Sequence, residues 1–257
     1  MKMLRRTVLI TGGTSGIGLE LARQLLQVGN TVIITGRVQE KLDKASRALP
    51  AVHAFRSDAS DPAAIEELHR DVLAQFPALD TLVNNAGIMR NLRLGQERSL
   101  IDVTSEIAVG LNGPIWMVQQ FLPHLRTQRN ALIVNVTSGL AFVPFPAAPI
   151  YCAAKAALHT YTQCLRAQLD GSGVTVIELA PPGTETPLFR SEFAKEMKRE
   201  KAMRPAVLVH RAIKGIEAGK LEIRPGVSNV LKIASRVAPH FMFRQMTKLS
   251  QLEAKAA

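Results

Sequence analysis

The stretch RTVLITGGTSGIGLELARQLLQVG, residues 6–29, decides the fold. It begins with a β-branched and apolar run, passes through a glycine-rich turn, and continues with apolar residues at helical spacing as far as Gly29. A strand, a tight turn and a helix in this order are typical of the unit that opens a dinucleotide-binding fold. Glycines let the backbone approach a pyrophosphate, and the positive N-terminus of the helix attracts it. The spacing is Gly-x3-Gly-x-Gly instead of the more common Gly-x-Gly-x2-Gly, so the turn alone is a moderate signal.

The same alternation of strand and helix continues along the chain. Apolar runs predict further strands, and helical spacing predicts helices between them; the strands are expected at 31–36, 51–58, 79–87, 131–138 and 174–183, and the helices at 38–49, from 61 onward, 97–108, 113–128 and 150–169. Repeated βα units with short connections predict an α/β fold, a Rossmann-type doubly wound parallel sheet flanked by helices in a single domain over 1–257. Ligands of such sheets bind at the carboxyl ends of the strands.

Composition limits the class of protein. A chain of 257 residues with 47% hydrophobic residues can bury one sizeable core. Cys152 and Cys164 lie twelve residues apart on one predicted helix, too far apart to pair, so a reducing cytoplasmic location is expected. The apolar run after Arg6 is too short for a secretion signal, and no apolar run is long enough to span a membrane.

The net charge of +11 is concentrated near the C-terminus, where residues 190–250 hold 14 Lys or Arg against 5 Glu. Such a region is either a solvated basic surface or a binding site for an anionic partner. Residues 227–257 form a basic amphipathic extension, which we expect to cover the cleft or contact another subunit; membrane-surface contact is possible but less favoured. Nucleic acid is not expected as a partner, because aromatic residues make up only 5% and no nucleic-acid-reading motif is present.

The chemistry is concentrated in VTSGLAFVPFPAAPIYCAAK, residues 136–155. Ser138 ends an apolar strand, and Tyr151 and Lys155 stand four residues apart on one face of the next predicted helix. A nearby ammonium favours the phenolate, so Lys155 should lower the pKa of Tyr151 toward the range of an acid–base catalyst. The Ser138 hydroxyl can hold a carbonyl or hydroxyl oxygen at the same point.

The residue after the strand at 31–36 indicates the type of dinucleotide. An NAD site is expected to place Asp or Glu here for the ribose 2′-hydroxyl, whereas this chain has Arg37. A guanidinium pairs well with a 2′-phosphate, so the sequence favours NADP(H), with NAD(H) as the alternative.

Taken together, the motifs resemble those of the short-chain dehydrogenase/reductase family over about residues 5–225. They are Thr11-Gly12-x3-Gly16-x-Gly18, Asn84-Asn85-Ala86-Gly87, Asn112, Ser138 and Tyr151-x3-Lys155. Within that family the chain looks most like the DltE-type oxidoreductases, on the residues ITGGTSGIG (10–18), VTSGLAFVP (136–144) and SRVAPHFMFRQMTK (235–248).

The resemblance implies a role for each motif residue. Tyr151 would be the general acid or base, with Lys155 tuning it and binding the nicotinamide ribose, Ser138 positioning the substrate oxygen, and Asn112 holding a relay water. The cofactor would be lined by Gly12, Thr14, Ser15, Gly16, Ile17, Gly18, Asp58, Asn85, Ala86 and Gly87. The nicotinamide end departs from the family pattern, because the run is Pro181-Pro182-Gly183-Thr184-Glu185-Thr186. Pro182 and Gly183 should lie there, and either Thr184 or Thr186 can meet the carboxamide.

The sequence therefore predicts an NADP(H)-dependent alcohol/carbonyl oxidoreductase, acting on a small molecule as a homodimer or homotetramer. The main alternative is a non-catalytic protein that binds and senses NADP(H). A serine hydrolase is disfavoured because Ser138 lacks a Gly-x-Ser-x-Gly elbow. The six histidines show no metal-ligand spacing, so no metal site is expected.

Overall fold

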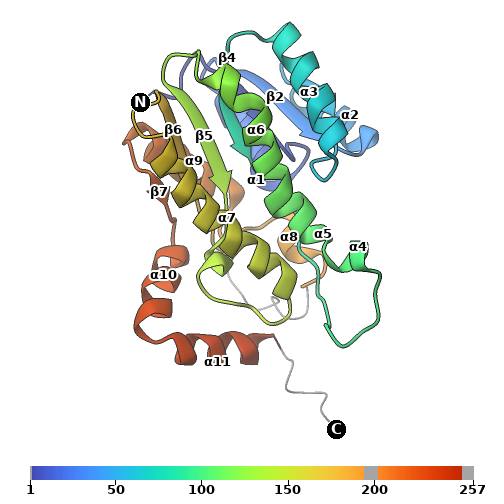
Figure 1. Ribbon diagram of the computed structural model, residues 1–257, viewed down its shortest axis with the longest axis vertical. Helices are drawn as coiled ribbons and strands as arrows, with labels where there is room; N and C mark the ends of the chain where they lie inside the picture. Colours follow the sequence, from blue (N-terminus) through green and yellow to red (C-terminus); the bar gives the residue numbers. More distant parts are fainter. Residues whose placement is uncertain (1, 194–201, 251–257) are drawn as a thin grey trace.

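The computed structural model describes residues 2–193 and 202–250, and its centre is one parallel sheet of seven strands (Figure 1). The strand order is β3-β2-β1-β4-β5-β6-β7, and every pairing is parallel. The strands are β1 (Thr7–Ile10), β2 (Thr31–Gly36), β3 (His53–Arg56), β4 (Leu79–Asn84), β5 (Ala131–Val136), β6 (Val174–Leu179) and β7 (Glu222–Ile223). The order reverses between β1 and β4, which is the switch point where such sheets bind ligands.

Helices cover both faces of the sheet. One face carries α1 (Gly16–Gln27), α2 (Gln39–Ala48) and α9 (Pro205–Glu217). The opposite face carries α3 (Pro62–Gln75), α6 (Gly113–Leu125) and α7 (Pro149–Gln168). Successive strand side chains point to opposite faces, so Val8 and Ile10 join the first cluster while Leu9 joins the second. The predicted doubly wound α/β fold is confirmed.

Each predicted strand is present, but four are shorter than predicted: the ranges 51–58, 79–87, 131–138 and 174–183 contain β3, β4, β5 and β6, which end at Arg56, Asn84, Val136 and Leu179. The helix expected at 97–108 is wrong in detail, because that segment is broken into α4 (Leu100–Val103), α5 (Ser105–Ile107) and a π-helical turn, Ala108–Asn112. The turn brings Gly110 close to Ala154 of α7, where a Cβ on the glycine would lie 3.6 Å from the alanine Cβ. Close packing against α7 therefore accompanies the irregularity.

Three further helices lie outside the two sheet-covering layers. A short helix, α8 (Pro187–Arg190), precedes α9, and α10 (Val227–Val237) and α11 (Pro239–Leu249) follow β7. Figure 1 shows α10 and α11 at one end of the molecule, on the side of the carboxyl ends of the strands. Residues 251–257 of the predicted extension lie outside the described residues. Within the described residues, none of the helices combines the length and hydropathy needed to span a bilayer.

The glycine-rich turn after β1 is fixed by its neighbours. Gly12 has a φ of 65°, in the left-handed region that favours glycine. Thr11 Oγ1 accepts hydrogen bonds from the backbone amides of Asn85 and Ala86, and the Asn85 amide group donates to the carbonyls of Thr11 and Gly12. The end of β4 thus holds the turn that ends β1.

We predict that Gly18→Ala destabilises the protein and weakens dinucleotide binding. A Cβ at Gly18 would lie 2.5 Å from the Gly12 carbonyl oxygen and 2.6 Å from Asn85 Nδ2, so the turn must shift. We expect a loss of about 1–3 kcal/mol in the free energy of unfolding, measured by urea denaturation. Gly95→Ala is the matched control, because its Cβ would meet nothing within 4 Å. Equal stability of the two variants would contradict the prediction.

Candidate functional site

A cavity of about 480 Å3 lies at the carboxyl ends of the strands, where the sequence predicts the site. Most of the predicted site residues line it: Gly12, Thr14, Ser15, Gly16, Ile17, Arg37, Asp58, Asn85, Ala86, Gly87, Ser138, Tyr151, Lys155, Pro182, Gly183, Thr184 and Thr186. Two predicted residues, Gly18 and Asn112, are not among the described residues that line it. Gly18 packs beneath the turn, and Asn112 ends the π-helical turn before α6.

Ser138, Tyr151 and Lys155 converge at one end of the cavity. Ser138 follows β5 and accepts a hydrogen bond from the Leu140 amide at 3.1 Å, which starts a short 3-10 helix, Gly139–Ala141. Lys155 Nζ donates to the carbonyl of Val136 at 2.8 Å and lies 5.8 Å from the centroid of the Tyr151 ring. This hydrogen bond joins α7 to the end of β5, the strand that precedes Ser138. Tyr151 and Lys155, both on α7, are thereby held near Ser138.

Burial controls the proton affinities of this group. Burial raises the pKa of Tyr151 to about 12, although a hydrogen bond with Ser138 acts in the opposite direction. Burial also lowers the pKa of Lys155 to about 8. The expectation that Lys155 lowers the pKa of Tyr151 is wrong for this structure, because desolvation dominates. At neutral pH Tyr151 is therefore protonated, the form that can donate a proton.

The opposite end of the cavity carries exposed basic residues. Arg37 follows β2, and Lys41, one turn into α2, lines the cavity beside it. Gly36 lets the chain pass Thr14 closely, since a Cβ there would lie 2.7 Å from Thr14 Cγ2. Sequence reasoning missed Lys41, because Arg37 lies before α2 and helical spacing therefore does not relate the two side chains.

Asp58, at the same end, has its Oδ1 occupied by the backbone amide and the hydroxyl of Ser60, at 2.9 and 2.7 Å. These bonds fix the direction of the carboxylate, which lines the cavity.

Both candidate threonines after β6 line the cavity, and each has a structural bond. Thr184 is buried, and its hydroxyl donates to the Pro182 carbonyl at 2.8 Å. Thr186 caps α8, donates to the Thr184 carbonyl at 3.2 Å, and places its side chain against Gly16. The segment after β6 therefore packs directly on the glycine-rich turn.

The wall beside Ser138 and Tyr151 is apolar and comes from several distant segments. Its side chains are Met89, Val109, Leu140, Leu188, Phe189, Leu231, Met246 and Leu249. Only Leu140 belongs to the apolar run between Ser138 and Tyr151. Met246 and Leu249 belong to α11, so the described part of the extension lines the cleft, in line with one of the two uses favoured for it above.

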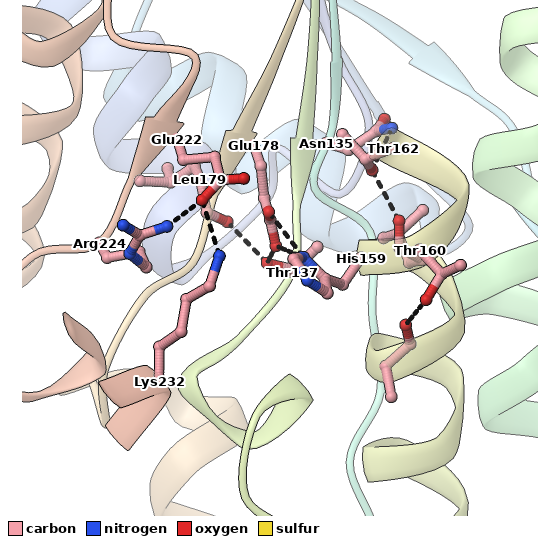
Figure 2. Close-up of polar contacts among 12 residues, drawn as sticks. Asn135, Thr137, His159, Thr160, Thr162, Glu178, Leu179, Glu222, Arg224 and Lys232 are labelled. Carbon is pink, nitrogen blue, oxygen red and sulfur yellow. Dashed lines mark hydrogen bonds and ion pairs between the residues drawn. The ribbon is translucent and has the colours of Figure 1, made fainter. Parts of the chain in front are cut away.

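A largely buried polar network joins α7 to β5 and β6 (Figure 2). Glu178, on β6, is 1% exposed; it accepts a hydrogen bond from the Thr137 hydroxyl at 2.6 Å and pairs with His159 Nδ1 at 2.8 Å. Asn135 donates to Thr162 at 2.9 Å. The contacts of His159 with Glu178 and of Thr162 with Asn135 join α7 to β6 and β5. The described residues contain no cluster of side chains suited to a metal ion.

Comparison with known proteins agrees with these features. The protein-family model described as short chain dehydrogenase matches residues 6–197 of this chain. The chain belongs to the short-chain dehydrogenase family. This short-chain dehydrogenase is 41% identical over 248 residues to DltE, an uncharacterized oxidoreductase of Bacillus subtilis, covering 96% of this chain and 98% of the relative. It is 31% identical over 175 residues to the NADP-dependent 3-hydroxy acid dehydrogenase YdfG of Escherichia coli, covering 68% of this chain and 71% of the relative.

Among solved structures, a short-chain dehydrogenase from Burkholderia cenocepacia in complex with NADP aligns with a TM-score of 0.82. The alignment covers 96% of this chain and 99% of that one, at 22% identity. At this identity the likeness supports the fold alone. The family assignment makes this chain an oxidoreductase of the short-chain dehydrogenase type.

We predict that Lys155→Met changes how stability depends on pH. The folded pKa of about 8 lies below the ordinary value of 10.5, so between these values the unfolded state binds more protons. Between pH 8 and 10.5 the free energy of unfolding of the wild type should therefore rise relative to that of Lys155→Met, by up to about 3 kcal/mol. Urea denaturation of both proteins at several pH values measures this difference. A difference that stays constant with pH would contradict the prediction.

Proposed function

We propose that this short-chain dehydrogenase is an NADP(H)-dependent oxidoreductase acting on a carbonyl or secondary alcohol substrate. The observation that carries the proposal is one cavity with Ser138, Tyr151 and Lys155 at one end and Arg37 with Lys41 at the other. When bound, NADP(H) would supply a hydride for reduction of the substrate or accept one for its oxidation.

The residues between the two ends fit a dinucleotide. Ser15, Gly16 and Ile17 line the cavity at the N-terminus of α1, whose first turn contains no acidic residue. The Ser15 side chain does not cap the helix. The helix N-terminus therefore keeps its positive end for a pyrophosphate. Arg37 and Lys41 would bind a ribose 2′-phosphate, which favours NADP(H) over NAD(H).

The chemistry at the other end rests on proton transfer by Tyr151. Its protonated hydroxyl, hydrogen-bonded to Ser138, would give its proton to the substrate oxygen during reduction and take it back during oxidation. Ser138 would hold that oxygen in place. Lys155 would bind the nicotinamide ribose, and Asn112 would hold a water that returns a proton toward Lys155. Thr184 or Thr186 would contact the carboxamide.

We further propose that the enzyme works in the cytoplasm as a homodimer or homotetramer. Cys152 is buried and Cys164 is exposed on the same helix, an arrangement that suits a reducing compartment. Gel filtration with light scattering measures the subunit count directly.

We predict that Arg37→Ala and Lys41→Ala each weaken NADPH binding about tenfold, because each removes a charge-assisted bond to the 2′-phosphate. NADH binding should stay unchanged. Fluorescence titration of each variant with both cofactors measures the effect. Lys44→Ala is the matched control, because Lys44 is an exposed lysine of the same helix that does not line the cavity. Equal binding of NADPH and NADH by the wild type would refute the NADP(H) preference.

We predict that Tyr151→Phe lowers turnover by at least about 100-fold while NADPH binding persists, since only the transferable proton is lost. The assay follows NADPH oxidation with a panel of ketones and aldehydes, including 3-oxo acids because of the relative in Escherichia coli. Wild-type protein that binds NADPH but turns over no member of the panel would favour the sensing protein instead.

A further inference from the structure

The two C-terminal helices each have one face on the body of the protein. Ser228 of α10 is buried and Leu231 lines the cavity, as do Met246 and Leu249 of α11. Lys232 Nζ donates to Glu222 on β7 at 2.8 Å and lies 5.3 Å from the centroid of the Phe142 ring. Figure 2 shows this lysine reaching from α10 to the strand. Both helices are therefore fixed in orientation, and their outward faces are defined.

The outward faces expose large apolar side chains. On α10, Val230, Ile233 and Val237 are 59%, 58% and 80% exposed, and their i, i+3, i+7 spacing puts them on one face. On α11, Phe241 is 59% exposed and shares a face with Arg244 and Lys248 at the same spacing. Apolar residues gathered in this way mark an interaction surface more often than residues scattered singly do.

The charge of these helices is of one sign. Residues 223–250 contain Arg224, Lys232, Arg236, Arg244 and Lys248 and no Asp or Glu. Arg224 and Lys232 bond to Glu222, whereas Arg236, Arg244 and Lys248 are exposed and form no ion pair within residues 2–193 and 202–250. Exposed apolar side chains flanked by basic ones, with no acidic residue, complement an anionic and partly apolar partner.

We propose that the outward faces of α10 and α11 bind the surface of a bilayer that contains anionic lipids. Apolar side chains would enter the region between headgroups and acyl chains, while Arg236, Arg244 and Lys248 meet lipid phosphates. A second copy of this chain fits less well. A symmetric contact would bring the same basic side chains together, and the whole chain carries a net charge of +11.

The test is flotation of the full-length protein with vesicles of phosphatidylcholine, alone or mixed with phosphatidylglycerol. We expect binding to the mixed vesicles, little binding to phosphatidylcholine alone, and release near 1 M salt, where the Debye length is about 3 Å. The variant Arg236→Gln/Arg244→Gln/Lys248→Gln should bind mixed vesicles about 100-fold more weakly, at about fivefold for each basic side chain. Ile233→Ser/Phe241→Ser should also lose binding, although its charge is unchanged.

The matched control removes three exposed basic residues from α2 and α9, in Lys44→Gln/Arg47→Gln/Arg211→Gln, and should keep most of the vesicle binding. Circular dichroism of every variant checks that the fold is intact. Wild-type protein that floats with neither vesicle overturns the proposal, and so does equal weakening by the control and the test variant. If Ile233→Ser/Phe241→Ser instead lowers the mass measured by light scattering and vesicle binding is absent, the faces join copies of the chain.

Discussion

The candidate site depends on one buried hydrogen bond, from Lys155 Nζ to the carbonyl of Val136. That carbonyl ends β5, and Ser138 lies two residues further along the chain, so the bond fixes the distance between the strand and α7. Lys155 is only 4% exposed, and burying its charged amine costs free energy, which is why burial lowers its pKa. A helix packed here by apolar contacts alone could rotate or slide by small amounts, whereas a directional bond at this point sets where Tyr151 stands against Ser138.

Further polar contacts continue along the same face of α7. His159 follows Lys155 by four residues and meets Glu178 on β6, and Thr162 meets Asn135 on β5. A carboxylate that is 1% exposed in the middle of a parallel sheet needs its partners. Sliding β6 by one residue would turn Glu178 to the other face of the sheet, away from His159 and Thr137. The network therefore opposes wrong strand registers in the region beneath the site.

Much of this arrangement could be predicted from the sequence, because it depends on local patterns. Apolar runs located the strands, and motif spacing located Ser138, Tyr151 and Lys155. The errors arose where contacts with segments distant in the sequence determine the local geometry or the pKa of a side chain. The break in the helix at 97–108 accompanies packing against α7, and the pKa of Tyr151 follows from burial, which spacing does not reveal. Met246 and Leu249 could not be assigned to the cavity, because nothing in a C-terminal helix indicates which of its faces turns toward a cleft formed by other elements.

The two ends of the cavity are built differently, and this bears on what the family assignment can say about the substrate. The cofactor end is formed by segments that directly follow β1, β2, β3 and β4, all inside the matched range 6–197. The apolar end takes Leu231, Met246 and Leu249 from helices beyond that range. The reaction type thus depends on the sheet, while the shape around the substrate depends on where α10 and α11 rest. The position of these helices therefore shapes the apolar end of the cavity, where Met246 and Leu249 pack in one cluster with Leu188 and Phe189.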